Sequence, residues 1–271
     1  MATAVFFHAH PDDEAIATGG TMVLAARNGH RVVLVCATDG AVGEADPSHI
    51  PDGSTLADVR RYETEKAAAV LGVHRLEFLG YRDSGMRGES TNDDPRCFWQ
   101  ADVNEAAERL AAILRQEQAD VLTIYDSIGG YHHPDHVQVH RVGLQAATLV
   151  GELEVFESTM HRERMAVMVD DPEWAGDDEE VREQQRREFA DLELGTPAAA
   201  ITHAIDVSSV ATTKRQAMAA HRSQIGEDSF FLTITEEKFV AAFGTEWYVH
   251  RGDSPKGEPY RDTLFEFGTD G

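Results

Sequence analysis

Cysteine is scarce in this sequence, which has two, Cys36 and Cys97, among 271 residues. Two cysteines so far apart cannot build a disulfide framework, and they exclude a cysteine-based zinc knuckle. Cys36 lies in an apolar run, where a buried, unreactive thiol is expected.

Basic residues are also few. The chain has 24 Lys and Arg against 48 Asp and Glu, which gives a formal net charge of −24. A field of this sign repels the phosphates of nucleic acids and anionic membrane surfaces. We therefore expect no nucleic-acid partner, and we interpret the excess of carboxylates as a means of keeping the protein soluble.

Long hydrophobic runs are absent. No window reaches the 18 or so apolar residues that a membrane span requires. The first residues form a short apolar stretch with no charged region before it, unlike a signal peptide. The sequence thus predicts a soluble cytoplasmic protein, and it gives no indication of the oligomeric state.

Short apolar runs alternate with helical patterns over the first 160 residues. The expected strands are 4–7, 31–37, 75–79, 120–125 and 155–160, and the expected helices are 14–28, 57–71, 101–118 and 135–149. Strict alternation of strand and helix is typical of a mostly parallel sheet with helices on both faces. The fold class predicted is α/β, Rossmann-like.

The pattern changes after residue 160. Segment 170–193 holds 11 acidic and three basic residues, and a solvated helix is expected from about 178 to 189. A strand at 201–207 and helices at 208–222 and 236–243 follow. We expect two portions: a Rossmann-like core at 1–160, and a smaller α+β portion at 161–271 that completes the sheet and caps the site.

Two stretches concentrate chemically active side chains. His8–Glu14 follows the first expected strand and Tyr131–His140 follows the fourth, and four of the 13 histidines fall between residues 132 and 140. The carboxyl ends of parallel strands meet at one edge of a sheet, so we expect both stretches to lie together there. Imidazoles and carboxylates without a thiolate are typical of a catalytic zinc site.

These residues resemble a known family. His10-Pro11-Asp12-Asp13-Glu14 with a distant His133-Pro134-Asp135-His136 is similar to the LmbE-like, or PIG-L, family of zinc-dependent N-deacetylases. Further matches, in order, are segments 38–44, 60–63, 81–86 and 214–224, so the resemblance covers roughly residues 4–250. The chain looks most like the actinobacterial deacetylases and conjugate amidases of mycothiol metabolism.

The resemblance implies a metal centre and a base. His10, Asp13 and His136 match the zinc ligands of the family, with iron(II) as the alternative ion because the same ligands suit several divalent cations. Asp12 matches the general base, which would take a proton from water and return it to the leaving amine. The other reading of Asp12 is a helix N-cap.

The resemblance also implies residues that handle the substrate. His133 matches the group that stabilises the oxyanion, and Tyr131 matches a tyrosine that can donate its hydroxyl to the same oxygen. Asp135 would hold a histidine in one tautomer. Arg60 and Asp83 match positions that contact the sugar-like part of the substrate.

The function expected is zinc-dependent N-deacetylation of an N-acetylglucosaminyl-type glycoconjugate or related small molecule. An amidase of thiol S-conjugates or of a natural-product intermediate is an alternative. A nucleotide-binding module is disfavoured, since no Gly-x-Gly-x-x-Gly follows the first strand. A non-catalytic metal-binding protein is disfavoured by Asp12 and His133, which a purely structural site would not need.

Overall fold

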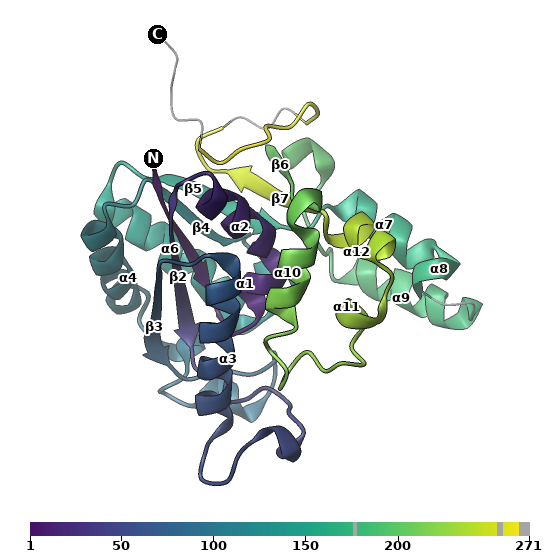
Figure 1. Ribbon diagram of the computed structural model, residues 1–271, viewed down its shortest axis with the longest axis horizontal. Coiled ribbons are helices and arrows are strands. Elements are labelled where there is room, and N and C mark those ends of the chain that lie inside the picture. The colour runs from purple at the N-terminus through teal and green to yellow at the C-terminus, as the bar shows by residue number, and fades with distance from the viewer. Residues whose placement is uncertain (176–177, 254–256, 266–271) are drawn as a thin grey trace.

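A single seven-stranded sheet forms the centre of the protein, whose computed structural model describes residues 1–175, 178–253 and 257–265 (Figure 1). The strand order is β3-β2-β1-β4-β5-β7-β6. The first five strands are parallel, and they are β1 Thr3–His8, β2 Arg31–Thr38, β3 Arg75–Tyr81, β4 Val121–Tyr125 and β5 Glu154–Thr159. The predicted α/β class with a mostly parallel sheet is confirmed.

Helices cover both faces of the sheet, and β1, β2 and β4 are therefore buried along nearly their whole length. One face packs against α1 (Asp13–Ala17), α2 (Gly19–Arg27), α3 (Leu56–Leu71) and α10 (Ala211–Met218). The other packs against α4 (Val103–Glu117) and α6 (Pro134–Val150). Each face therefore has its own apolar core.

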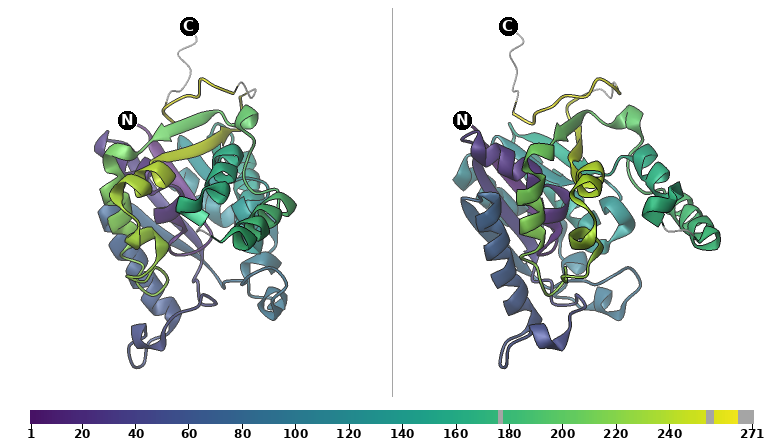
Figure 2. Two further views of the ribbon diagram at one scale, coloured as in Figure 1. Left: turned by 90° about the vertical axis from the view of Figure 1, so that its right-hand side faces the viewer. Right: turned by 45° about the vertical axis from the view of Figure 1, so that its right-hand side comes forward.

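The C-terminal portion extends the same sheet. β7 (Thr245–His250) pairs antiparallel with β5 and with β6 (His203–Asp206). The remaining helices are α5 (Gly129–His132), α7 (Arg162–Asp170), α8 (Pro172–Ala175), α9 (Glu179–Asp191), α11 (Phe230–Thr233) and α12 (Glu236–Phe243). The group α7–α9 stands out at one side of the molecule and contains the acidic segment (Figures 1 and 2).

The helix expected at 14–28 is two helices. It breaks at Thr18, whose φ of −135° is not helical. The Thr18 hydroxyl forms a hydrogen bond with His8 Nε2 at 2.8 Å. After the break, the amides of Gly20 and Thr21 each donate to the Glu246 carboxylate at 2.8 Å, which caps the new helix start. A carboxylate from β7, distant in the sequence, thus decides where α2 begins.

No helix in the described part of the chain combines the length and the apolar character needed to cross a membrane. The described connections contain five 3₁₀ turns, at Pro47–His49, Ser90–Asp93, Phe98–Gln100, Ala198–Ala200 and Ser208–Val210. The last of these begins where the sequence predicts a helix at 208–222, and α10 follows it directly.

Candidate active site

The two histidine-rich stretches meet at the carboxyl edge of the sheet. β1 ends at His8 and β4 ends at Tyr125, and the two strands are parallel neighbours with Ala4 opposite Val121. From β1 the strand order continues to β2 and β3 on one side, while from β4 it continues to β5 on the other. Ligands of open α/β sheets bind in the crevice at such a reversal point.

The carboxylate of Asp13 lies between two imidazoles. Its Oδ2 is 3.2 Å from His10 Nδ1 and 3.3 Å from His136 Nε2. Burial opposes ionisation, but His136 and His10 hold the pKa of Asp13 well below its usual range. Two imidazole nitrogens and an ionised carboxylate oxygen therefore converge on one small volume.

Donor atoms gather more widely around His10. Among the described residues, two sets have all their donor atoms within 4.8 Å of one another: His10 with His133 and His136, and His10 with Asp83 and Asp135. Nitrogen and oxygen donors without sulfur suit a divalent cation of the zinc or iron(II) type. The donor chemistry thus fits a metal, while the particular ligand set of His10, Asp13 and His136 stays a prediction.

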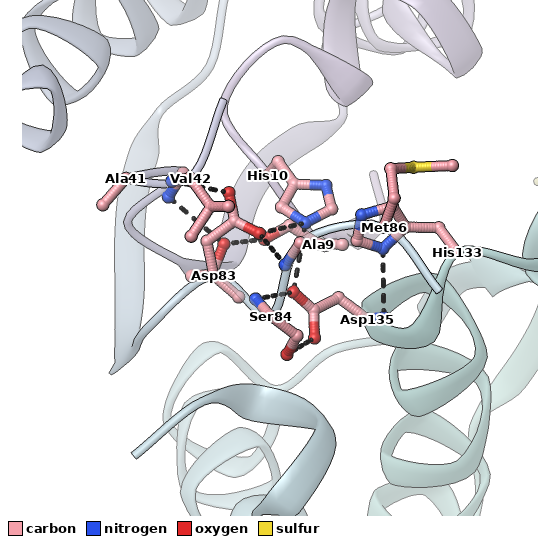
Figure 3. Close-up of polar contacts among 12 residues, drawn as sticks. Ala9, His10, Ala41, Val42, Asp83, Ser84, Met86, His133 and Asp135 are labelled. Carbon is pink, nitrogen blue, oxygen red and sulfur yellow. Dashed lines mark hydrogen bonds and ion pairs between the residues drawn. The ribbon is translucent and has the colours of Figure 1, made fainter. Parts of the chain in front are cut away.

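Asp135 holds the far side of the His10 ring (Figure 3). His10 Nε2 is 3.1 Å from Asp135 Oδ2, and the backbone amide of Ser84 donates to the same oxygen at 2.9 Å. The Ser84 hydroxyl donates to Asp135 Oδ1 and accepts from the amide of Trp99 at 2.9 Å. The histidine that Asp135 orients is therefore His10, and both carboxylate oxygens are satisfied.

Asp83 also faces the His10 ring rather than open solvent. Its Oδ1 is 3.5 Å from His10 Nε2 and accepts from the amide of Gly85 at 2.9 Å, and its Oδ2 accepts from the amide of Val42 at 3.2 Å. Burial raises the pKa of Asp83, but the His10 ring, the Gly85 amide and the charge of Arg60 together lower it. The sugar contact expected for Asp83 stays a prediction.

Asp12 has an unusual backbone. Its φ is 105°, a region that few residues other than glycine adopt, and its side chain makes no capping hydrogen bond to α1. Burial raises the pKa of Asp12 to about 6, although the Arg60 guanidinium, 3.2 Å from Asp12 Oδ2, opposes the rise. The helix-cap reading is thus not supported, because the carboxylate caps no backbone amide of α1.

Arg60 lies behind Asp12, almost fully buried. Its Nη1 donates to the carbonyl oxygen of Gly40 at 2.7 Å, and its Nη2 donates to that of Pro11. Nη2 also lies 3.2 Å from Asp12 Oδ2, and Nε has no hydrogen-bond partner among the described residues. A substrate contact by Arg60, expected from the sequence, stays a prediction.

His133 caps α6 with its own ring. Its Nδ1 accepts from the amide of Asp135 at 3.1 Å, which leaves Nε2 to carry the proton of the neutral ring. Burial, together with the nearby His10 and His136, lowers the pKa of His133 to about 4. At neutral pH, His133 is therefore a neutral hydrogen-bond donor rather than a cation.

Tyr131 reaches the site from an irregular turn. Its hydroxyl is 3.5 Å from His136 Nε2, and the side chain is partly exposed. Gly130 and His132 on either side have φ values of 71° and 67°. The Asp126 carboxylate fixes this turn by accepting from the amides of Ile128 and Gly130.

Several supporting residues have no role assigned from the sequence. Ser84 and Asp126 hold Asp135 and the Tyr131 turn, and each sits beside a residue or motif that the sequence does single out. His140, without an assigned role in the sequence, bonds to the carbonyl oxygen of Tyr125 at 3.0 Å and is structural. His221 approaches from the C-terminal portion and contacts Glu14 at 2.6 Å.

Comparison with known proteins identifies the family. A family model described as PIG-L, GlcNAc-PI de-N-acetylase, matches residues 5–147. The chain belongs to the PIG-L family. The amide-hydrolysing enzyme class expected from the sequence is confirmed at the level of the family.

Two curated relatives in the PIG-L family are described as 1D-myo-inositol 2-acetamido-2-deoxy-alpha-D-glucopyranoside deacetylases. The one from Thermobifida fusca is 39% identical over 95% of this chain and 96% of its own. The one from Acidothermus cellulolyticus is 36% identical over 98% and 94%. Among solved structures, the N,N'-diacetylchitobiose deacetylase from Pyrococcus horikoshii shares the fold, with a TM-score of 0.58, 22% identity, and coverage of 94% of this chain and 84% of that one.

Proposed function

We propose that this PIG-L family member is a zinc-dependent hydrolase that removes the acetyl group from an N-acetylglucosaminyl inositol or a close analogue. The observation that carries the proposal is the Asp13 carboxylate between His10 and His136. The neighbouring Asp12 carboxylate does not cap α1. A purely structural metal site has no use for the second carboxylate.

His10, Asp13 and His136 are the residues proposed to hold the metal. A bound divalent cation supplies Lewis-acid chemistry that makes water a competent nucleophile near neutral pH. Asp135 keeps the His10 ring in one orientation, and such outer partners tune both affinity and basicity. Zinc is our choice of ion, with iron(II) as the alternative.

Asp12 is proposed to move the proton. Hydrolysis adds water across the amide carbon–nitrogen bond, so one proton must leave the attacking water and one must reach the departing amine. A carboxylate with a pKa of about 6 is suited to both transfers at neutral pH. Its neighbour Arg60 keeps the ionised form available.

His133 and Tyr131 are proposed to stabilise the oxyanion. Attack on the amide carbonyl places negative charge on its oxygen, and neutral donors placed in advance lower the cost of that charge. The free Nε2–H of His133 and the Tyr131 hydroxyl are such donors. In this proposal His133 acts as a neutral donor and not as an imidazolium cation, because its pKa is lowered to about 4.

The names of the relatives favour an amino sugar linked to inositol as substrate. An amidase acting on thiol S-conjugates or on a natural-product intermediate is the second candidate, since the same proposed machinery would serve any small amide. A cytoplasmic location is part of the proposal, as the sequence predicts.

A substrate screen tests this function. Purified protein is stripped with a chelator, reloaded with zinc, and assayed for acetate or amine release from N-acetylglucosaminyl inositol, simple N-acetyl amino sugars and thiol-conjugate amides. We expect zinc-dependent release, fastest with the inositol compound. Absence of release from every amide by the reloaded protein would contradict the proposal.

A further inference from the structure

A fully buried contact joins the site to the C-terminal portion. His221, which follows α10, places its Nε2 2.6 Å from Oε1 of Glu14, and both residues have no exposed surface. The two residues are 207 positions apart. Sequence spacing alone could not have paired them.

The other oxygen of Glu14 holds the backbone of Asp12. The amide of Asp12 donates to Glu14 Oε2 at 2.9 Å. Asp12 has φ 105° and ψ −33°, a conformation that is strained for a residue with a side chain and persists only where its surroundings enforce it. The Glu14 carboxylate is thus one of the groups that enforce it.

His221 is itself fixed in place by α3. Two residues after His221, the amide of Ser223 donates to the Glu63 carboxylate at 2.8 Å and the Ser223 hydroxyl donates to it at 2.6 Å. Glu63 lies three residues after Arg60, which contacts Asp12. Helix α3 therefore holds Asp12 in two ways. Arg60 contacts the Asp12 carboxylate directly. Glu63 fixes the turn after His221, and His221 in turn holds the Asp12 backbone through Glu14.

The ring of His221 has a single polar contact with the site. Its Nδ1 has no hydrogen-bond partner in the described part of the protein, so Nε2 alone connects the ring to Glu14. A buried polar atom without a partner is costly, so a side chain chosen for packing alone would be apolar. The imidazole of His221 instead points its other nitrogen at the carboxylate that holds Asp12.

A second buried pair provides the comparison. Lys214 Nζ lies 2.6 Å from Glu246 Oε1, with both side chains almost fully buried, and the same carboxylate caps the start of α2. This pair also joins the C-terminal portion to the N-terminal helices. Among the described residues, no hydrogen bond or ion pair joins this pair to Asp12 or Glu14, so we expect it to serve the fold.

We propose that the Glu14–His221 pair is a positioning device for Asp12, holding its strained backbone so that the carboxylate stays beside Arg60, one residue from the proposed ligand Asp13. The inference rests on the proposed function, in which Asp12 moves the proton. Without the His221 donor, the buried Glu14 carboxylate loses one of its two partners and shifts, and Asp12 relaxes with it. A displacement of about 1 Å at a reacting group can cost on the order of 100-fold in rate.

The test replaces His221 with leucine, which fills similar space without a donor. We expect His221→Leu to lower kcat by about 10- to 100-fold while KM and the metal content change little. Lys214→Met is the matched control, since it breaks the other buried pair that joins the C-terminal portion to the N-terminal helices. It should lower thermal stability yet leave kcat within about twofold of the wild type.

Two further variants separate positioning from folding. His221→Gln places an amide nitrogen near the lost Nε2, whereas His221→Asn is too short to reach Glu14. We expect the glutamine variant to recover most of kcat and the asparagine variant not to. Equal kcat in these two, or a leucine variant as active as Lys214→Met, would overturn the inference. Inactivity of the wild-type enzyme on every amide would instead overturn the proposed function.

Discussion

At the scale of the residue, the proposed chemistry depends on donors that are neutral and fixed. His133 has Nδ1 engaged as an acceptor at the start of α6, so only its Nε2–H is available to a substrate oxygen. Tyr131 offers a hydroxyl from a turn that Asp126 fixes. Neither group needs to gain or lose a proton during attack on an amide.

The oxyanion role can be tested by truncating each donor. We expect His133→Ala to raise the barrier by about 3 kcal/mol, lowering kcat with little change in KM or metal content, because the interaction strengthens only in the transition state. Tyr131→Phe should cost less, since its side chain is partly exposed. Steady-state kinetics decide: a raised KM at unchanged kcat would make His133 a residue that holds the ground-state substrate.

Ser84 offers a second residue-scale test. Removing its hydroxyl takes one hydrogen bond from Asp135 and leaves the Trp99 amide unpaired. We expect Ser84→Ala to weaken zinc affinity by about 10-fold, the lower end of the effect of such outer partners. Competition with a chromogenic chelator measures it. Thr148→Ala is the control, because it removes an exposed hydroxyl that donates to the Leu144 carbonyl oxygen within α6, away from Ser84 and Asp135. Equal affinities of the two variants would refute the role.

At the scale of the element, the sequence predicted much of the core. The expected helices at 57–71, 101–118 and 135–149 correspond to α3, α4 and α6 within two residues at each end, because capping residues and apolar periodicity mark them locally. The helix expected at 178–189 corresponds to α9. The break at Thr18 was missed, since it depends on Glu246, which lies in a distant strand.

The site residues divide in the same way, into those that local motifs mark and those that only tertiary packing reveals. His10, Asp13 and His136 were predicted as metal ligands from the resemblance of their motifs to the family, and that role stays a prediction. No role was assigned to Ser84, and the pairing of Glu14 with His221 was not predicted, since a serine and a lone histidine look ordinary until tertiary packing buries them. β7 was not predicted, because its antiparallel partner β5 ends at Thr159, far from Thr245, where β7 begins.

Strand β5 carries a titration that should be visible in stability. Burial raises the pKa of Glu157 from an ordinary 4.5 to about 7, despite Arg251 at 3.2 Å. Between these values the folded protein keeps a proton that the unfolded chain releases. Stability from this group is therefore complete below pH 4.5 and is lost as the pH rises through 7.

Glu157→Gln tests this linkage. The variant should lose less stability than the wild type between about pH 4.5 and pH 8, by roughly 1 to 3 kcal/mol. Urea unfolding at several pH values measures the difference. The exposed Glu152→Gln, just before the strand, is the control and should follow the wild type. Parallel curves for all three proteins would contradict the assignment.

At the scale of the whole molecule, the reversal of strand order between β1 and β4 places the site, and the net charge affects the stability of the fold. A formal charge of −24 repels itself in the compact state. Salt screens this repulsion, with a Debye length of about 10 Å at 0.1 M. We expect the urea midpoint to rise as sodium chloride is raised from about 0.05 to 0.5 M; an unchanged or lower midpoint would mean that the charges are already balanced locally.

The measurement that tests the central claim most directly is the metal content of five proteins by elemental analysis, with turnover of each. The wild type should carry about one divalent ion per chain, and His10→Ala, Asp13→Ala and His136→Ala should lose metal and activity together. Asp12→Ala should keep the ion while turnover falls by about 10²- to 10⁴-fold. Full metal content in all three ligand variants, or full turnover in Asp12→Ala, would contradict the account.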